Sequence, residues 1–317
     1  IVSQFDIAGT LISCVRYGEG HINDTFKATV LEDGRKEVHY ILQRINHRLF
    51  TEVDKLMHNI ALVSDFCRRS VLSRGGDPSR ECLSLIRTKG GETYYFDGEN
   101  YFRMYVFIER ATSYQTVRDA KDFYESAVAF GNFANLLAEF DASQLYEVLP
   151  DFHNTKVRYK KFIAAVDKDV CGRAKEVAAE IEWVKAHKDL CGQIVDKIAA
   201  GEIPLRVTHN DTKLNNVMLD DETGKGIAVI DLDTVMPGSL CYDFGDSIRF
   251  GCNSAAEDEP DLSKVHFRVD LYETYLKGYL SAVGNGITGA EKKALPLGAA
   301  LMTYECGMRF LTDYLEG

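Results

Sequence analysis

Positively charged residues are scarce in this chain of 317 residues, with 37 Lys and Arg against 48 Asp and Glu and a formal net charge of −11. A protein that binds nucleic acid needs a clustered basic surface, so this balance argues against that class. Long apolar runs are also missing. None approaches the about 20 residues that cross a bilayer, and none has the pattern of a secretory signal. We therefore expect neither nucleic acid nor a membrane among the partners of this protein.

Cysteine and proline lead to two further exclusions. The eight cysteines are scattered without a C-x-x-C pair, which excludes a zinc knuckle and argues against a disulfide scaffold. Only six prolines occur and no segment is of low complexity, so we expect no disordered region. Scattered thiols are typical of the reducing cytoplasm, where we expect the protein to reside. With 45% apolar residues, a chain of this length can bury one large core or two lobes.

The most informative stretch covers residues 206–233 and contains two polar clusters. The first cluster is His209, Asp211 and Asn216, in the spacing H-x-D-x-x-x-x-N. The second is Asp231 and Asp233, at the end of the apolar run Ile227 to Ile230, which contains β-branched residues and reads as a buried strand. Single Asp or Asn residues beside strands are usually turn formers, so the joint pattern carries the interpretation.

This arrangement suits phosphoryl transfer. The Asp211 carboxylate can accept the proton of an attacking hydroxyl, which makes it the candidate catalytic residue. Asn216 and Asp231 offer the oxygen ligands that Mg²⁺ prefers, since this ion takes few ligands from protein and the others from phosphate and water. The sequence therefore predicts ATP and Mg²⁺ as cofactors, with Asn216 and Asp231 as metal ligands.

The wording H-N-D-T-K-L-N-N followed by V-I-D-L-D resembles the aminoglycoside phosphotransferase and choline kinase family. The longer wording T-H-N-D-T-K-L-N-N-V-M-L-D with I-D-L-D-T-V-M-P-G is most similar to the bacterial N-acetylhexosamine 1-kinase branch. The resemblance implies an α+β, protein-kinase-like fold of two lobes. A small β-rich lobe over 1–108 would bind the nucleotide phosphates, and a larger, mostly helical lobe over 109–317 would hold the catalytic loop and the substrate pocket.

The implied function is ATP-dependent phosphorylation of a small-molecule hydroxyl, with the anomeric hydroxyl of an N-acetylhexosamine as the first choice of acceptor. Homoserine, choline or an aminoglycoside are rival acceptors, and an acidic segment over 254–261 would suit the cationic ones. A catalytically inactive nucleotide-binding regulator is an alternative from another class. A protein kinase is disfavoured because no A-P-E follows Asp231. The oligomeric state stays open.

A glycine-rich hairpin over residues 17–30 is the candidate for binding the nucleotide phosphates. Backbone N–H groups at its tip could approach the phosphates, so Gly18, Gly20, Asn23 and Thr25 are candidate binding residues. His21 at the same tip could touch the substrate or cap the turn.

The next strand, over 38–45, lacks the lysine that protein kinases carry there and reads Gln43-Arg44 instead. Arg44 could bind phosphate, since a guanidinium suits that partner, or could lie on the surface. A helix over 50–69 could supply a polar partner for the phosphate-binding cation, and the sequence does not choose among Glu52, Asp54 and Asn59.

Asp243 lies in a segment that resembles the family's G-D-P-x-x-D-L pattern, where an Asp supports the catalytic loop. We expect Asp243 and His209 to have this structural role. Residues 243–245 spell D-F-G, but the metal aspartate should follow the buried strand, which favours Asp231. Asp233 could assist with metal or substrate. Arg309, on a helix expected over 289–314, either pairs with Glu305 inside the protein or donates to a substrate hydroxyl.

Overall fold

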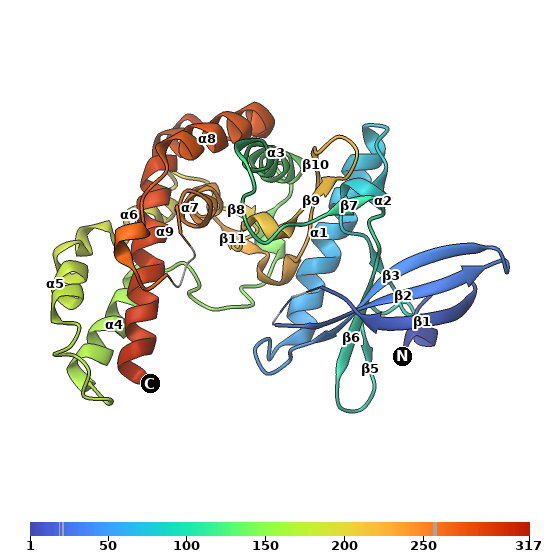
Figure 1. Cartoon of the computed structure of the whole chain (residues 1–317), viewed down its shortest axis with the longest axis horizontal. Helices are drawn as coiled ribbons and strands as arrows, with labels where there is room; N and C mark the ends of the chain where they lie inside the picture. The colour runs from blue at the N-terminus through green and yellow to red at the C-terminus, as the bar shows by residue number, and fades with distance from the viewer. Residues whose placement is uncertain (19, 21, 256–258) are drawn as a thin grey trace.

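The computed structural model describes residues 1–18, 20, 22–255 and 259–317 (Figure 1). An antiparallel sheet forms the N-terminal part, and most of the later chain is helical. Helix α1 (Val53–Ser73) lies between the sheet and the helical part. We call the sheet with α1 and α2 (Pro78–Glu81) the N-terminal lobe, and the chain after the sheet the C-terminal lobe. This architecture is the α+β class that the sequence predicted.

The sheet of the N-terminal lobe is antiparallel throughout, in the order β1-β2-β3-β6-β4, with β5 also paired to β6. A tight turn joins β2 to β3, where Asp33 and Gly34 both have positive φ, the conformation of a type I′ hairpin. The strands are β1 (Thr10–Arg16), β2 (Asp24–Glu32), β3 (Lys36–Ile45), β4 (Leu85–Ile86), β5 (Tyr95–Phe96) and β6 (Tyr101–Val106).

The two faces of this sheet differ in polarity. Tyr40 and Leu42 of β3 pack with Met104 of β6 in a small apolar core on one face. Since successive side chains alternate in a strand, Gln43 and Arg103 point to the opposite face, and the pairing register places these two residues directly opposite each other. A polar pair therefore lies on the face of the sheet away from its apolar core.

A short linker and an ion pair join the two lobes. The linker leads from β6 to β7 (Ala111–Thr112), which pairs with β9 in the C-terminal lobe. Beside it, Arg80 of α2 lies 2.5 Å from Asp220 of β9 and also donates to the backbone carbonyl of Glu109 in the linker. Both side chains of the ion pair are largely buried, so the contact is a fixed part of the connection.

The C-terminal lobe places its helices around two small strand pairings, β10-β9-β7 and β11-β8. The strands are β8 (Arg206–Thr208), β9 (Val217–Asp220), β10 (Gly226–Val229) and β11 (Met236–Gly238). The helices are α3 (Ala120–Leu136), α4 (Thr155–Lys168), α5 (Ala178–Ala186), α6 (Gln193–Ala199), α7 (Leu240–Gly251), α8 (Val269–Val283) and α9 (Gly289–Glu316). In the described ranges, no helix has the length and apolar character needed to cross a bilayer.

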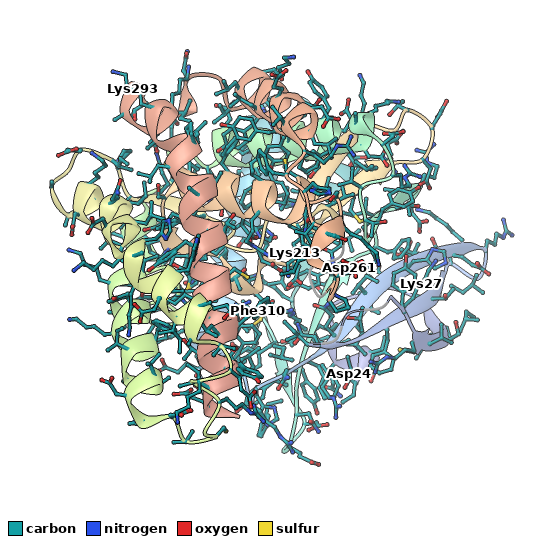
Figure 2. The ribbon with its side chains drawn as sticks, turned by 60° about the vertical axis from the view of Figure 1, so that its left-hand side comes forward. Asp24, Lys27, Lys213, Asp261, Lys293 and Phe310 are labelled. Atoms are coloured by element: carbon teal, nitrogen blue, oxygen red, sulfur yellow. The ribbon has the colours of Figure 1, made fainter. Side chains whose placement is uncertain are left out.

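Helix α9 is fixed against β8, the strand that leads into the loop of Asp211, and against α7. Thr288 and Glu291 form a capping box at its start, and the Glu291 carboxylate also pairs with Arg206 of β8 at 3.2 Å. Further along, a Cβ on Gly298 would lie 2.1 Å from the backbone oxygen of Cys241, so only glycine permits this approach to α7. In Figure 2, Lys293 lies near the start of α9, Phe310 lies on its C-terminal half, and Asp24 and Lys27 lie on β2.

Candidate active site

The loop that carries Asp211 follows β8 and is supported by Asp243 in the first turn of α7. One Asp243 carboxylate oxygen accepts from the backbone N–H of His209 and the other from that of Asn210, both at 2.8 Å. Asn210 has φ of 65°, a left-handed conformation that costs energy for a residue other than glycine. Burial raises the pKa of Asp243, and the hydrogen bonds from the two N–H groups oppose that shift. The geometry is that of a carboxylate clamp on the loop backbone.

The His209 ring ties the same loop to the end of β10. Its Nε2 lies 2.9 Å from the backbone oxygen of Ile230, and its Nδ1 accepts from the backbone N–H of Asp211 at 3.3 Å. These contacts assign a neutral ring with the proton on Nε2. The ring is fully buried, and Phe130 and Phe133 contact it edge to face. His209 thus links the loop to the strand that precedes Asp231.

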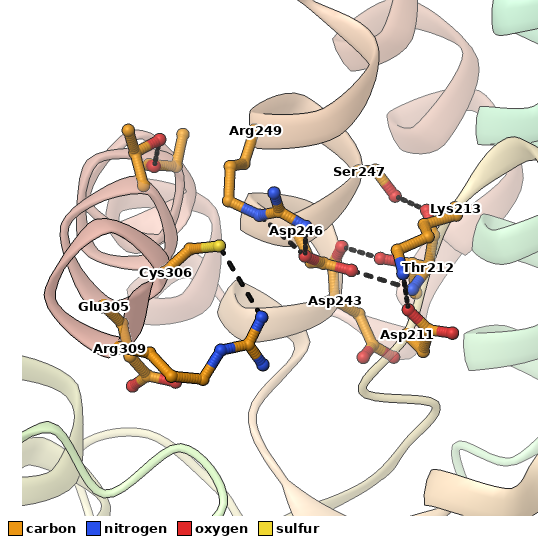
Figure 3. A network of polar contacts seen from close by, with 12 residues as sticks. Asp211, Thr212, Lys213, Asp243, Asp246, Ser247, Arg249, Glu305, Cys306 and Arg309 are labelled. Carbon is orange, nitrogen blue, oxygen red and sulfur yellow. Dashed lines mark hydrogen bonds and ion pairs between the residues drawn. The ribbon is translucent and has the colours of Figure 1, made fainter. Parts of the chain in front are cut away.

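Asp211 is partly exposed, and the side chains of Asn216 and Lys213 contact its carboxylate. Asn216 donates to its backbone oxygen at 2.8 Å and to its carboxylate at 3.1 Å. The Lys213 ammonium lies 3.0 Å from the other carboxylate oxygen, as Figure 3 shows. About a third of the Asp211 side chain, 31%, is exposed, so a substrate can reach it.

Asp231 follows β10 and brings a third carboxylate to the region. Its φ of 61° is again left-handed. Surrounding protein raises its pKa to about 7, first by desolvation and then through the charges of Asp233 and Asp211, although the side chain is still accessible to solvent. Such an excess of negative charge attracts a divalent cation.

The residues present fit Mg²⁺, since Asn216 and Asp231 supply the oxygen donors that this ion takes from protein. No group of three or more His, Cys, Asp or Glu able to hold a metal occurs in the part of the chain that the structure describes. A site with two protein ligands, completed by phosphate and water, agrees with both observations.

Asp233 is buried and contacts the N-terminal lobe. One of its oxygens accepts from the Asn23 side chain at 2.6 Å, and the other lies 2.5 Å from a terminal nitrogen of Arg103. Asn23 in turn accepts from the backbone N–H of Asn46 at 2.9 Å. The hairpin tip and strand β6 therefore meet on one carboxylate of the C-terminal lobe.

The other residues predicted for phosphate binding occupy different positions. Gly18 has φ of 75°, and nothing lies within 4 Å of a Cβ built on Gly18 or on Gly20. Thr25 accepts from Gln43 at 3.0 Å. The Arg44 guanidinium pairs with Asp24 and is about half exposed. His21 lies outside the described residues.

Helix α1 contacts the C-terminal lobe through Asn59 rather than through an acidic residue. The Asn59 amide donates to the backbone oxygens of Tyr146 and Val235 at 2.7 and 2.9 Å. Glu52 pairs with Lys55 within the same helix, and Asp54 accepts from the Tyr94 hydroxyl. A cation of the N-terminal lobe does pair with a carboxylate at the candidate site: Arg103 forms an ion pair with Asp233.

A small cavity of about 80 Å³ borders Asp211. Arg309 lines it but does not pair with Glu305, and its terminal nitrogen is 3.9 Å from the Cys306 sulfur (Figure 3). Glu305 instead lies 2.8 Å from His153 and 3.3 Å from Arg158. The lining residues are Phe152, His153, Arg158, Asn210, Asp211, Lys213, Asp246, Arg249, Met302, Glu305, Cys306 and Arg309.

Sequence reasoning missed Arg103, Lys213 and the contact between His153 and Glu305. Lys213 had a signal, because it lies two residues after Asp211 in the same loop. Arg103 could be predicted only from the strand pairing, because the register of β3 and β6 is what places this cation opposite Gln43. The contact between His153 and Glu305 joins residues 152 positions apart and had no local signal.

Comparison with known proteins gives a match in sequence and several in structure. The sequence model of a family described as "Phosphotransferase enzyme family" matches residues 13–282. A phosphotransferase designated APH(2″)-IIia, solved with GDP and kanamycin, has 13% identity and a TM-score of 0.58, with 99% of this chain and 90% of that chain covered. An ethanolamine kinase of Plasmodium vivax has 13% identity and a TM-score of 0.55, covering 96% of this chain and 77% of the other.

A microcompartment-associated aminopropanol kinase is a further structural match. It has 14% identity and a TM-score of 0.53, with 99% of this chain and 92% of that chain covered. At such identities the likeness is one of fold, and it confirms the predicted kinase-like α+β architecture.

Proposed function

The chain belongs to the phosphotransferase enzyme family, and from that premise we propose that it transfers the γ-phosphoryl group of ATP to the anomeric hydroxyl of an N-acetylhexosamine. The protein is accordingly an enzyme, a small-molecule phosphotransferase that acts on a hydroxyl group. The observation that carries the proposal is the position of the Asp211 carboxylate, which borders the small cavity while Asp243 holds the backbone of its loop.

In the proposed reaction, Asp211 accepts the proton of the acceptor hydroxyl as its oxygen attacks the γ-phosphorus. The bond from that phosphorus to the β–γ bridging oxygen breaks, and ADP leaves with the electron pair. Lys213, 3.0 Å from Asp211, provides positive charge beside the transferring group. Asn216 holds Asp211 through two hydrogen bonds, so the base does not need to reorganise as the reaction proceeds.

Asn216 and Asp231 would hold Mg²⁺. When bound, this ion neutralises charge that develops on the phosphate oxygens. The hairpin residues Gly18, Gly20 and Thr25 lie on the nucleotide side in this proposal, where backbone N–H groups can approach phosphate. Arg44 keeps its predicted phosphate contact only if it leaves Asp24, with which it pairs.

The charge of the cavity supports a neutral acceptor. Among its described lining residues, four cationic side chains face three acidic ones. An acceptor that carries ammonium groups, such as choline or an aminoglycoside, gains little attraction from such a surface. A sugar avoids that conflict because it carries hydroxyl groups without charge.

Two buried polar atoms, on residues that line the cavity, support an acceptor with several hydroxyl groups. Within the described residues, His153 Nε2 and Glu305 Oε2 have no hydrogen-bond partner. Buried polar atoms that lack a partner are costly, and a hydroxyl is able to satisfy both an acceptor and a donor. Arg309 would then donate to a further hydroxyl of the same acceptor.

The test is release of ADP from Mg-ATP with a panel of acceptors: N-acetylglucosamine, N-acetylgalactosamine, homoserine, choline and kanamycin. We expect turnover of the two N-acetylhexosamines, and a loss of about 10²- to 10⁴-fold in kcat for Asp211→Asn, because that change removes the base. Turnover of another acceptor keeps the chemistry and overturns the sugar. Absence of turnover with every acceptor overturns the proposal.

Asp196→Asn is the matched control for Asp211→Asn. Asp196 also pairs with a lysine, Lys156, at 2.5 Å, but on an exposed surface of the helical part. Equal losses in the two variants would show that Asp211 acts through the fold and not as the base.

A further inference from the structure

The fully buried arginine of the N-terminal lobe has no role in the reaction as described so far. Arg103 is 1% exposed and carries its charge within the protein. Its Nε donates to the Gln43 side chain at 2.9 Å, and its guanidinium lies 5.5 Å from the centre of the Tyr105 ring. A buried cation is expensive unless it is paired, so its retention needs a reason.

The place of Arg103 in the sheet suggests that reason. Protein kinases hold a phosphate-side lysine on strand β3, and β3 of this chain has Gln43 and Arg44 there. Arg44 points away to Asp24 at the surface. Arg103 is the residue directly opposite Gln43 on β6, so the buried cation is one strand over from the place of the lysine.

The pairing partner connects Arg103 to the candidate site. Asp233 is two residues beyond Asp231 in a short turn, and Asp231 is in a left-handed conformation that its surroundings must maintain. One oxygen of Asp233 takes the Arg103 guanidinium and the other takes Asn23 of the hairpin. Movement of Asp233 would therefore shift the Asp231 carboxylate and the hairpin tip together.

Resting on the proposed function, we infer that Arg103 is a positioning residue for phosphoryl transfer. It replaces the missing β3 lysine by holding Asp233, and through Asp233 it fixes the turn that carries Asp231 and the approach of the hairpin. The pair crosses between the lobes, so it also sets the distance between the nucleotide side and the catalytic loop. The lack of a lysine at the place of Gln43 and Arg44 on β3 is then no sign of an inactive regulator.

A double-mutant cycle tests whether Arg103 acts through Asp233. The proteins are the wild type, Arg103→Met, Asp233→Asn and the variant with both changes. Each single change is expected to lower kcat by about 10- to 100-fold, the scale of loss that follows a misplacement of reacting groups by about 1 Å. The double variant is expected to lose no more than either single one, because the second change removes a partner that is already lost. Losses that multiply in the double variant overturn the inference.

The dependence on Mg²⁺ separates positioning from a merely structural role. If Arg103 and Asp233 fix Asp231, the Mg²⁺ concentration for half-maximal rate rises in all three variants, while KM for the acceptor stays near the wild-type value. A rise in the acceptor KM with an unchanged Mg²⁺ requirement would overturn the inference.

Folding is controlled within the same set of proteins. Removing one member of a buried ion pair leaves an unpaired charge and can unfold a single variant, whereas the double variant leaves none. A folded double variant, judged by its thermal unfolding, with wild-type kcat would refute the role of the pair. Arg87→Met is the matched control, since Arg87 pairs with Asp65 at 3.0 Å on the exposed side of the same lobe.

Calorimetric binding of Mg-ADP makes the test independent of the acceptor. We expect the double variant to bind Mg-ADP at least about tenfold more weakly than the wild type, since the site for the metal is displaced. If the wild type turns over no acceptor but binds Mg-ADP more tightly than the double variant by this factor, the proposed function fails and the positioning role of Arg103 stands. If the wild type turns over sugars and binding is equal in both proteins, the inference fails alone.

Discussion

Replacing Asp243 by Asn is expected to weaken the fold and to displace the loop that carries Asp211. The Asp243 carboxylate accepts from two consecutive backbone N–H groups, those of His209 and Asn210, at 2.8 Å each. An Asn side chain has one acceptor oxygen, so it can serve one of these groups and must turn its own N–H₂ toward the other.

The magnitude follows from these two bonds. A buried N–H that loses its acceptor costs about 1–3 kcal/mol, and the remaining bond loses its charge assistance. Desolvation raises the pKa of the Asp243 carboxyl, so the neutral amide recovers part of that cost. We expect a net loss of about 2 kcal/mol in the free energy of unfolding, and a larger loss for Asp243→Ala, which leaves both N–H groups unpaired.

Thermal unfolding and ADP release measure the two effects. At about 1.5 °C per kcal/mol for a chain of 317 residues, the expected fall in Tm for Asp243→Asn is about 3 °C. The fall in kcat is expected to be near 10²-fold, since the clamped residues directly precede Asp211. Asp270→Asn is the control, because Asp270 also lies in the first turn of a helix but is 61% exposed and pairs with Arg268. An Asp243→Asn protein with the Tm and kcat of the wild type would refute the clamp.

Two further predictions concern packing and pH. Gly298→Ala forces a Cβ within 2.1 Å of the Cys241 oxygen and is expected to cost about 1–3 kcal/mol of stability or more, whereas Gly307→Ala on the same helix has open space and is expected to stabilise by about 0.4–1 kcal/mol, both read from urea unfolding. In a chelating buffer, the raised pKa of Asp231 means that the folded protein keeps a proton that the unfolded chain has released, so the contribution of Asp231 to stability should fall as the pH rises from 3.8 to about 7. The Asp231→Asn variant lacks this loss, so its Tm should rise relative to the Tm of the wild type as the pH increases over this range. A Tm difference that stays constant with pH would contradict the raised pKa of Asp231.

Local patterns in the sequence predicted the main elements because each of them is encoded by nearby residues. The apolar spacing in 50–69 corresponds to α1, and the expected helix over 289–314 corresponds to α9. The strand expected over 38–45 lies within β3. The element boundaries differ by a few residues, because helix ends depend on caps and on tertiary contacts.

The residues of the candidate site that are close in sequence could be predicted, and those that the fold brings together could not. Asp211 and Asn216 lie on one loop, and Asp231 follows β10, the second strand after that loop. Their spacing was therefore visible in the sequence, and their roles remain predictions. The cation of the N-terminal lobe was not visible, because Arg103 is 60 residues from Gln43 and meets it only through strand pairing. The partners of Glu305 could not be predicted either, because His153 and Arg158 are far from it along the chain. The sequence had suggested only Arg309 as its partner.

The ion pair of Arg80 with Asp220 has a mechanical consequence. The linker after β6 is the covalent connection between the lobes, and the ion pair runs beside it as a second attachment. The Asn59 amide and the Asp233 carboxylate add further attachments, so the lobes are joined at several separate places. Attachments at separate places resist rotation of one lobe against the other, and Asn23 and Arg103 are therefore held on the same carboxylate.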